Sequence, residues 1–390
     1  MSVQPPYSAF EASEFDTRFT AARRVLAAAG IDACLMIAPE HLYYFAGYDS
    51  WVGVNSPQAL AFTAAGGDAP TLLLRDVDLP LARETTRVGD IRSYNLVTES
   101  FTERLRQCIE EKGVRGGRIG LELQSYALPA ALGFALQAAL PGLELVDTTR
   151  LLGDLRLIKS PAEMRYMQQA ASYAEAGLAA MRGSLAEGVS EIELAAAIEN
   201  GMRSAGSDYW AIPTELSSGA RSAGGHATPR ERRLEPGDLV HAEFAGVCRR
   251  YHATAIRTLA LGEPGPEARE LYAVALRSLE AGIAATVPGA SVAAIEEASL
   301  EPLRVHGLEQ TAMMRFGYGV GIAYPPIWLE TLQIARGFDY RMQPGMTFVL
   351  HSCLELPDEG LGVIQGGTWV MTDAGLQALA GASAGALEVL

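Results

Sequence analysis

Cysteine is scarce in this chain, and its spacing excludes several classes of protein. Cys34, Cys108, Cys248 and Cys353 are scattered along 390 residues without any C-x-x-C pair. This spacing argues against a disulfide framework or a zinc knuckle and fits the reducing cytosol. Cys248 lies beside the candidate site described below, where a nucleophilic thiol is an alternative to the small buried hydrophobe that we favour.

Long hydrophobic runs and an excess of positive charge are also missing. No apolar run approaches the length that spans a membrane, and residues 1–19 lack the basic and apolar regions of a signal peptide. The net charge of −15 argues against nucleic acid or an anionic membrane surface as a partner. We therefore expect a cytoplasmic protein. An acidic field would attract a cation, although solubility alone explains such a charge.

The chain is long enough for two or three domains, and 49% of its residues are hydrophobic, as in soluble proteins with a large core. Residues 15–29 have helical spacing, closed by Gly30, and residues 33–38 form a short apolar strand. A short helix follows near residues 40–49. Further strands are expected at residues 59–62, 70–74, 117–122 and 143–146, with helices between them. Residues 1–155 therefore predict an α/β domain.

A second domain, residues 156–390, begins at a strong helix-start signal. Ser160, Pro161 and Glu163 have the pattern of an N-cap, a first-turn proline and a capping-box glutamate. A second capping box follows at residues 190–193. Residues 175–190 also have a faint repeat at residues 280–291, each copy with the pattern of two helices followed by strands. Two such repeats packed face to face would place a site at their common interface.

Residues 224–258 contain the first candidate site residues. Residues 234–238 have turn chemistry, residues 239–247 form a strand, and residues 251–261 form its antiparallel partner across a tight turn near residues 249–250. Glu243 lies within the apolar strand, where an unpartnered carboxylate costs roughly several kcal/mol. It is therefore either a salt-bridged core residue or a functional group. We favour the functional interpretation, because a histidine lies a short loop upstream.

That histidine, His226, lies in a loop of small residues that has little to bury an imidazole. A histidine in such a loop is free to meet a ligand, and its pKa suits proton transfer near neutral pH. The alternative is a solvated loop histidine. His252 either approaches the same pocket or is structural, since strand alternation places it on the face opposite to Tyr251 and Ala253.

Residues 316–331 form a second unusual stretch, with a glycine at every second position from 317 to 321. Such glycines let the backbone approach a ligand closely. Tyr318, Tyr324 and Trp328 are candidates for cation–π walls of a pocket, and Glu330 for an added charge. The alternative for the aromatic residues is ordinary core. The stretch is no phosphate loop, because it lacks the following helix N-terminus.

The second half of the chain resembles the pita-bread fold shared by methionine aminopeptidase, prolidase, aminopeptidase P and creatinase. The resemblance implies an α/β (α+β) protein with a creatinase-like N-terminal domain and a C-terminal pita-bread domain of pseudo-twofold symmetry. In the peptidases, five acidic or histidine positions hold two metal ions. Those positions fall here on Glu243, Thr254, Tyr318, His351 and either Gln365 or Gly366. One carboxylate is a poor donor set for hard cations, so we expect no metal and no other cofactor.

Within this superfamily the chain looks most like the branch of ectoine hydrolase, which, like creatinase, lacks the dinuclear site. The segments that carry this likeness are residues 47–51, 226–228, 242–252 and 317–331. The branch opens a cyclic amidine by hydrolysing a C–N bond. Residues 348–359 depart from the expected pattern, and His351 is unusual, so the resemblance leaves the substrate open.

The resemblance implies a metal-independent hydrolase of a small cationic or zwitterionic amidine or guanidine-like compound. His226 would activate water, as the matching histidine does in creatinase. Glu243 would hold or attack the amidinium carbon, and Tyr318 with His351 would complete the polar shell. The alternatives are a peptidase or lyase with one metal at Glu243 and His351, and a non-catalytic binding protein. The other residues expected at the substrate are Tyr48, Trp51, Asn55, His252, Thr254, Arg257, Tyr324, Trp328 and Glu330.

For Arg257 and for the segment that contains Tyr48, Trp51 and Asn55, we expect specific roles. Arg257 would pair with carboxylates of the scaffold or of the substrate, and its T-x-x-R-T context across the superfamily favours the scaffold. Tyr48, Trp51 and Asn55 lie in a segment that, in creatinase-like proteins, helps to close the site of the other subunit. We therefore expect a homodimer.

Overall fold

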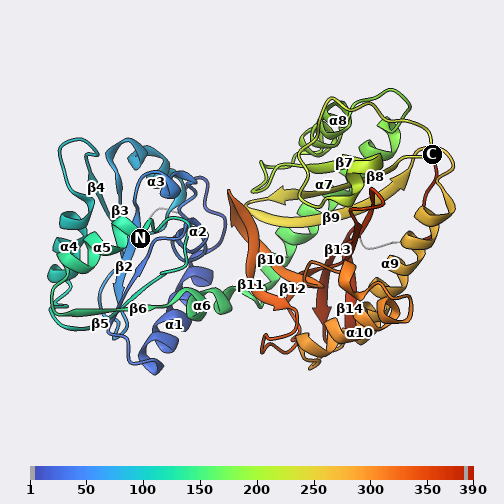
Figure 1. Ribbon diagram of the computed structural model, residues 1–390. Coiled ribbons are helices and arrows are strands. Elements are labelled where there is room, and N and C mark those ends of the chain that lie inside the picture. Colours follow the sequence, from blue (N-terminus) through green and yellow to red (C-terminus); the bar gives the residue numbers. More distant parts are fainter. Residues whose placement is uncertain (1–4, 382–384) are drawn as a thin grey trace. The chain divides into compact units, whose positions relative to one another are not determined.

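The computed structural model describes residues 5–381 and 385–390, which form two compact units, Met1–Arg156 and Leu157–Leu390. Each unit is built around its own sheet (Figure 1). The two-domain α/β architecture predicted from the sequence is confirmed. Within the described part of the chain, no helix combines the length and the apolar character needed to cross a membrane.

The N-terminal unit contains a six-stranded mixed sheet in the order β4-β3-β2-β1-β5-β6. The predicted strands are all present, and β4 is an additional one at the edge. Its sequence, DIRSY, is polar and only half-buried, which is why alternation did not reveal it. The strands are β1 (Ala33–Met36), β2 (Ala59–Thr63), β3 (Thr71–Arg75), β4 (Asp90–Tyr94), β5 (Gly117–Leu121) and β6 (Leu143–Asp147).

Helices cover this sheet and supply much of its core. Gly30 has φ of 67° directly after the first helix, the left-handed conformation that makes glycine the natural terminator there. Leu105, Ile109 and Leu136 from two of the helices pack against Leu35 and Ile119 of the sheet. The helices are α1 (Ala12–Ala28), α2 (Pro39–Ala46), α3 (Leu79–Thr85), α4 (Phe101–Glu111), α5 (Ala130–Ala139) and α6 (Thr149–Gly153).

The C-terminal unit contains two helix pairs, each followed by strands, as the sequence repeat predicts. Both predicted capping boxes are present: Ser160 accepts the backbone N–H of Glu163, and Ser190 accepts that of Glu193, with the two glutamates bonding back. Figure 1 shows α9 and α10 beside the strands β12, β13 and β14. The helices are α7 (Pro161–Ser184), α8 (Glu191–Ser204), α9 (Pro266–Ala285) and α10 (Val292–Val305).

The strands of this unit form one curved sheet in the order β11-β10-β12-β13-β9-β8-β7, with β14 paired to β13. The predicted hairpin is present, and Arg249 and Arg250 form its turn with φ of 49° and 68°. The strands are β7 (Glu215–Ser218), β8 (Leu239–Cys248), β9 (Tyr251–Ala260), β10 (Gly317–Tyr324), β11 (Ile327–Ile334), β12 (Thr347–Leu356), β13 (Leu361–Thr372) and β14 (Gly375–Ala380).

The two faces of this sheet have different roles. Phe244, Leu350 and the alternate residues of their strands on the same face pack against the four helices and form the core. Because side chains alternate along a strand, Glu243 and His351 project from the opposite face. The cross-strand register joins Glu215 to Glu243, Glu243 to Ile256, Ile256 to Gly366, and Gly366 to His351. One row of residues therefore crosses five strands on the face that carries no helix.

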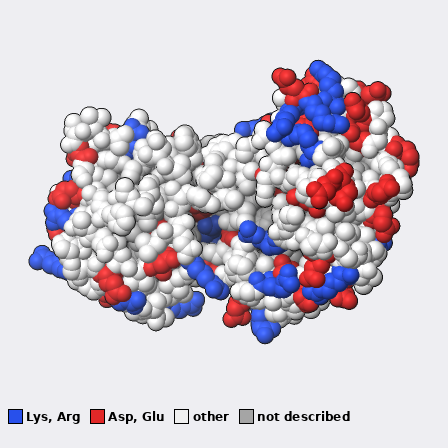
Figure 2. Space-filling view, viewed as in Figure 1, with Lys and Arg blue, Asp and Glu red and all other residues white. Residues whose placement is uncertain are grey.

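The surface of the C-terminal unit has mixed charge on the face drawn in Figure 2. Basic and acidic side chains lie together over α8. Arg233 and Glu193 of this unit form one exposed ion pair. On this face, the basic side chains are interspersed with acidic ones rather than arranged as a stripe.

Candidate active site

A cavity of about 530 Å³ opens on the helix-free face of the C-terminal sheet. Three of the four predicted catalytic side chains project into it from different strands: Glu243 from β8, Tyr318 from β10 and His351 from β12. The fourth, His226, reaches it from the loop before β8. The lining residues are Ile212, Glu215, His226, Glu243, Met313, Met314, Arg315, Tyr318, Pro326, Ile327, Trp328, Leu329 and His351.

Glu243 is buried and takes part in a short chain of hydrogen bonds. The Tyr318 hydroxyl donates to its carboxylate at 2.6 Å, and Trp328 Nε1 donates to the Tyr318 oxygen at 3.2 Å. Burial, and then the charge of Glu215, raise the pKa of Glu243 from 4.5 to about 7. The pKa of Tyr318 is raised well above 10 by burial and by Glu243, so the phenol remains a hydrogen-bond donor.

The two histidines of the cavity are in different environments. His351 is 4% exposed, its ring centroid lies 5.8 Å from that of Tyr318, and Nδ1 has no hydrogen-bond partner among the described residues. Burial, followed by Arg315 and His226, lowers the pKa of His351 to about 4, so its imidazole is neutral near pH 7. His226 is exposed, with a left-handed φ of 54°. It is the histidine that solvent can reach.

Two charged side chains of the cavity, Glu215 and Arg315, were not predicted as site residues. Glu215 is the cross-strand neighbour of Glu243, and burial raises its pKa from 4.5 to about 7. Arg315 donates to the side-chain oxygen of Gln333. Neither lies in a motif, and the register that places Glu215 beside Glu243 depends on strand pairing. Leu216, Ser217 and Ser218 follow Glu215, so the sequence around it does not mark a buried carboxylate.

Five predicted substrate contacts of the C-terminal unit lie outside the cavity lining: Thr254 is fully buried, and the other four are bonded elsewhere. His252 accepts the backbone N–H of Ala211 and bonds the carbonyl of Arg250, so both ring nitrogens are occupied by the backbone. Arg257 donates to the Gly381 carbonyl. Glu330 forms a buried ion pair with Lys159 at 2.6 Å, and the ring of Tyr324 lies 5.2 Å from the Arg250 guanidinium. These four residues stabilise the scaffold.

The alternating glycines of β10 also have a different purpose from the one expected. A side chain at Gly317 would meet the Val349 carbonyl at 2.3 Å, and one at Gly321 would meet Glu330 Oε1 at 2.4 Å. The missing side chains therefore make room for a neighbouring strand and for the buried ion pair of Lys159, not for a ligand. Trp328, in contrast, lies in the cavity wall as expected.

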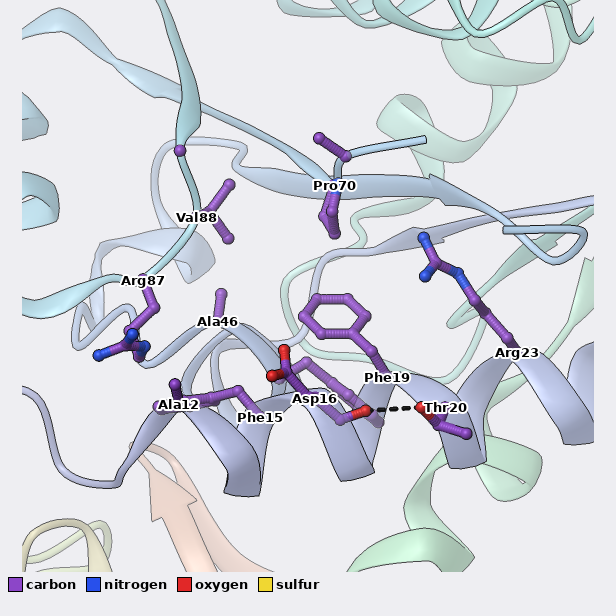
Figure 3. Close-up of a pocket in the computed structure, with 13 residues that line it drawn as sticks. Ala12, Phe15, Asp16, Phe19, Thr20, Arg23, Ala46, Pro70, Arg87 and Val88 are labelled. Atoms are coloured by element: carbon purple, nitrogen blue, oxygen red, sulfur yellow. Dashed lines mark hydrogen bonds between the residues drawn. The ribbon is translucent and has the colours of Figure 1, made fainter. Parts of the chain in front are cut away.

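The N-terminal unit has a hollow of its own, of about 400 Å³, between α1 and the ends of β3 and β4 (Figure 3). Phe15 and Phe19 form its floor, and Asp16, Arg23 and Arg87 contribute charge of both signs. Among the described residues that line it, none has a buried polar atom without a partner. In the cavity of the C-terminal unit, Nδ1 of His351 is such an atom. That cavity is therefore the candidate site.

Comparison with known proteins assigns the family. Residues 165–373 match the model of metallopeptidase family M24, and residues 18–158 match the creatinase/prolidase N-terminal domain. The chain belongs to metallopeptidase family M24. The predicted superfamily is thereby confirmed, as is assignment to a family of hydrolases.

Relatives of this M24 protein include enzymes of more than one specificity. It is 27% identical to an ectoine hydrolase of Halomonas elongata, with 95% of this chain and 96% of that protein covered. It is 25% identical to a Xaa-Pro dipeptidase of Pyrococcus furiosus, with 90% and 93% covered. A dipeptidase structure from Pyrococcus horikoshii superposes with a TM-score of 0.85 at 23% identity, covering 96% of this chain and 100% of that one.

The five positions that the resemblance assigns to the metal ligands of the peptidases carry residues that do not fit a dinuclear site. Four are Glu243, Thr254, Tyr318 and His351, and the register identifies the fifth as Gly366, since Gly366 faces His351 and Ile256. Gln365 projects to the other face, toward Tyr272 of α9. Residues 5–381 and 385–390 contain no cluster of three His, Cys, Asp or Glu side chains able to hold a metal ion. A single carboxylate, already bonded to a phenol, leaves too few oxygen donors.

Proposed function

We propose that this M24 protein hydrolyses a C–N bond of a small cationic amidine or guanidine-like compound without a metal ion. The observation that carries the proposal is the isolation of the two cavity carboxylates. Glu243 has a phenol as its hydrogen-bond partner, and neither Glu243 nor Glu215 forms an ion pair with any described Lys or Arg. A buried anion without a counter-ion is costly, and a cationic ligand removes that cost.

The side chains of the cavity provide the groups that such a reaction requires. His226 takes a proton from water, and the hydroxide adds to the amidinium carbon. The tetrahedral intermediate then loses its C–N bond, and His226 returns the proton to the leaving nitrogen. Glu243 stabilises the amidinium, or adds to its carbon directly before water releases the product. The hydrogen bond from Tyr318 holds the carboxylate in place in either route.

Two other functions remain alternatives on the same fold. A Xaa-Pro peptidase or a lyase with one metal at Glu243 and His351 is supported by the similarity to a Xaa-Pro dipeptidase. A non-catalytic binding protein would retain the cavity without turnover. The donor set at the five metal positions disfavours the first alternative, and His226 at the cavity mouth disfavours the second.

Proton NMR of chelator-treated protein tests the reaction. We expect ectoine, 5-hydroxyectoine or creatine to be converted to a ring-opened product or to released urea at the same rate before and after chelation, because no step depends on a metal ion. The same sample, analysed for metal content, should contain far less than one ion per chain. Turnover that disappears on chelation and returns with a divalent cation would establish the metal-dependent alternative.

The proposal includes a homodimer in which the N-terminal unit of one subunit helps to close the cavity of its partner. Trp51 and Asn55 are exposed, as this role requires, whereas Tyr48 is fully buried in its own unit and supports the segment from within. The same unit has other exposed apolar side chains, Val77 in the turn after β3 and Val97 in the loop after β4.

Light scattering with size-exclusion chromatography tests this assembly. We expect the mass of a dimer for the native chain, since Trp51 is 52% exposed and would otherwise remain in water. Trp51→Ala should shift the equilibrium toward monomer and lower turnover. Phe134→Ala, which truncates a more exposed aromatic side chain elsewhere on the same unit, should change neither. A monomeric native chain with full turnover would exclude a shared site.

A further inference from the structure

Glu215 places a second carboxylate in the candidate site at a position that the five metal-ligand positions do not include. It begins β7 and is paired directly with Glu243 of β8. Directly opposed residues of an antiparallel pair have Cβ atoms roughly 5 Å apart and project from the same face. Both side chains line the same cavity. The two carboxyl groups therefore converge on one ligand-sized space.

The groups around this pair leave its charge uncompensated. Glu215 has no hydrogen bond or ion pair with any described side chain, and Glu243 accepts one hydrogen bond from Tyr318. The guanidinium of Arg315, which also lines the cavity, is bonded to Gln333. The titratable and charged groups that face the pair from the surrounding elements are His226, Arg315, Tyr318, His351, Cys353 and Glu355.

Two neighbouring carboxyl groups in a half-buried site do not both ionise readily. Burial disfavours the charge on each, and the charge on one disfavours the charge on the other. The pKa of each is raised to about 7, with the charge of Glu215 contributing to the shift at Glu243. A cation that contacts both carboxyl groups removes this cost, because it compensates both charges at once.

We propose that Glu215 and Glu243 form a clamp for a planar cation with N–H groups on two nitrogens. Each carboxylate accepts an N–H from a different nitrogen, as in charge-assisted bidentate pairs. Trp328 and the other apolar wall residues suit the flat face of such a cation. This inference rests on the proposed function and specifies its substrate class: amidinium or guanidinium rather than quaternary ammonium or a neutral amide.

Three small probes separate these chemical classes in calorimetric titrations of the full chain. Acetamidine is a planar cation with N–H groups on two nitrogens, tetramethylammonium is a cation without N–H, and acetamide is a neutral analogue. We expect acetamidine to bind at least tenfold more tightly than the other two.

The preference for acetamidine over tetramethylammonium is the readout that distinguishes a clamp from a structural role. Glu215→Gln should weaken acetamidine binding by roughly tenfold or more and reduce its preference over tetramethylammonium. Glu215→Asp should restore part of both, and Glu235→Gln, an exposed carboxylate in the turn before β8, should match the native chain. Thermal unfolding of each variant verifies that it is folded.

The outcomes for the clamp and for the reaction are separable. Acetamidine binding that depends on Glu215, but without turnover of any amidine, supports the clamp and overturns the proposed hydrolysis. Turnover of an amidine with the same KM and the same acetamidine affinity in Glu215→Gln supports the hydrolysis and overturns the clamp. Equal binding of acetamidine and tetramethylammonium also overturns the clamp, because it would mean that charge alone is recognised.

Discussion

Replacing Glu243 with glutamine should reduce turnover by roughly 10³-fold or more while making the protein more stable at alkaline pH. Glutamine has nearly the same shape and its oxygen still accepts the hydrogen bond from the Tyr318 hydroxyl. It cannot carry the negative charge that holds or attacks a cationic substrate. Turnover by this variant within tenfold of the native rate would exclude Glu243 from the reaction.

The stability effect of this substitution follows from the raised pKa of Glu243. The carboxyl group titrates near 4.5 in the unfolded chain and at about 7 in the folded protein. Between these values the folded state binds more protons, so the free energy of unfolding falls as pH rises and levels off above pH 7. A shift of this size corresponds to roughly 3 kcal/mol. Glu243→Gln removes the penalty, so we expect a gain of about 1–3 kcal/mol at pH 8 and little change at pH 4.5.

Chemical denaturation at the two pH values measures this difference. Glu235→Gln is the matched control, because it removes an exposed carboxylate from the turn that leads into the same strand. It should leave both turnover and the pH dependence of stability unchanged. Equal stability of the native chain and Glu243→Gln at pH 8 would mean that the buried carboxylate has a compensating partner, which would contradict the basis for a cationic substrate.

Replacing His226 should lower kcat by roughly 10² to 10⁴-fold, the usual contribution of a general base. The imidazole lies at the mouth of the cavity and interacts electrostatically with Glu243. His351, the other imidazole there, is buried with a pKa lowered to about 4 and is a poorer base near neutral pH. The loss should therefore appear in kcat more than in the affinity for a cation.

The backbone at His226 determines which variant is informative. Its φ of 54° is left-handed, a conformation that asparagine tolerates better than alanine. His226→Asn should therefore fold like the native chain and lack turnover, and added imidazole should restore part of the rate in His226→Ala. His306→Ala, which removes an exposed histidine after α10, serves as the control. If His226→Asn keeps the native turnover, a group other than His226 acts as the base.

Local patterns in the sequence predicted most of the C-terminal unit. The capping boxes at Ser160 and Ser190, the hairpin turn at Arg249 and Arg250, and the two helix–helix–strand repeats depend on residues close together in the chain. Such short-range preferences are largely independent of the rest of the fold. Strand β4 was not predicted, because its residues are mostly polar and half-buried and show no apolar alternation.

The sequence by itself determined that Glu243 is a carboxylate out of place in an apolar strand, and that the metal positions of the family hold too few oxygen donors. Only the tertiary structure decided which neighbours these residues have. Strand register brings Glu215 beside Glu243 and turns Gly366 rather than Gln365 toward the cavity. It also gives Glu330 its partner Lys159, distant in the chain. Pairing partners across a sheet are non-local, and a shift by one residue moves every side chain to the other face.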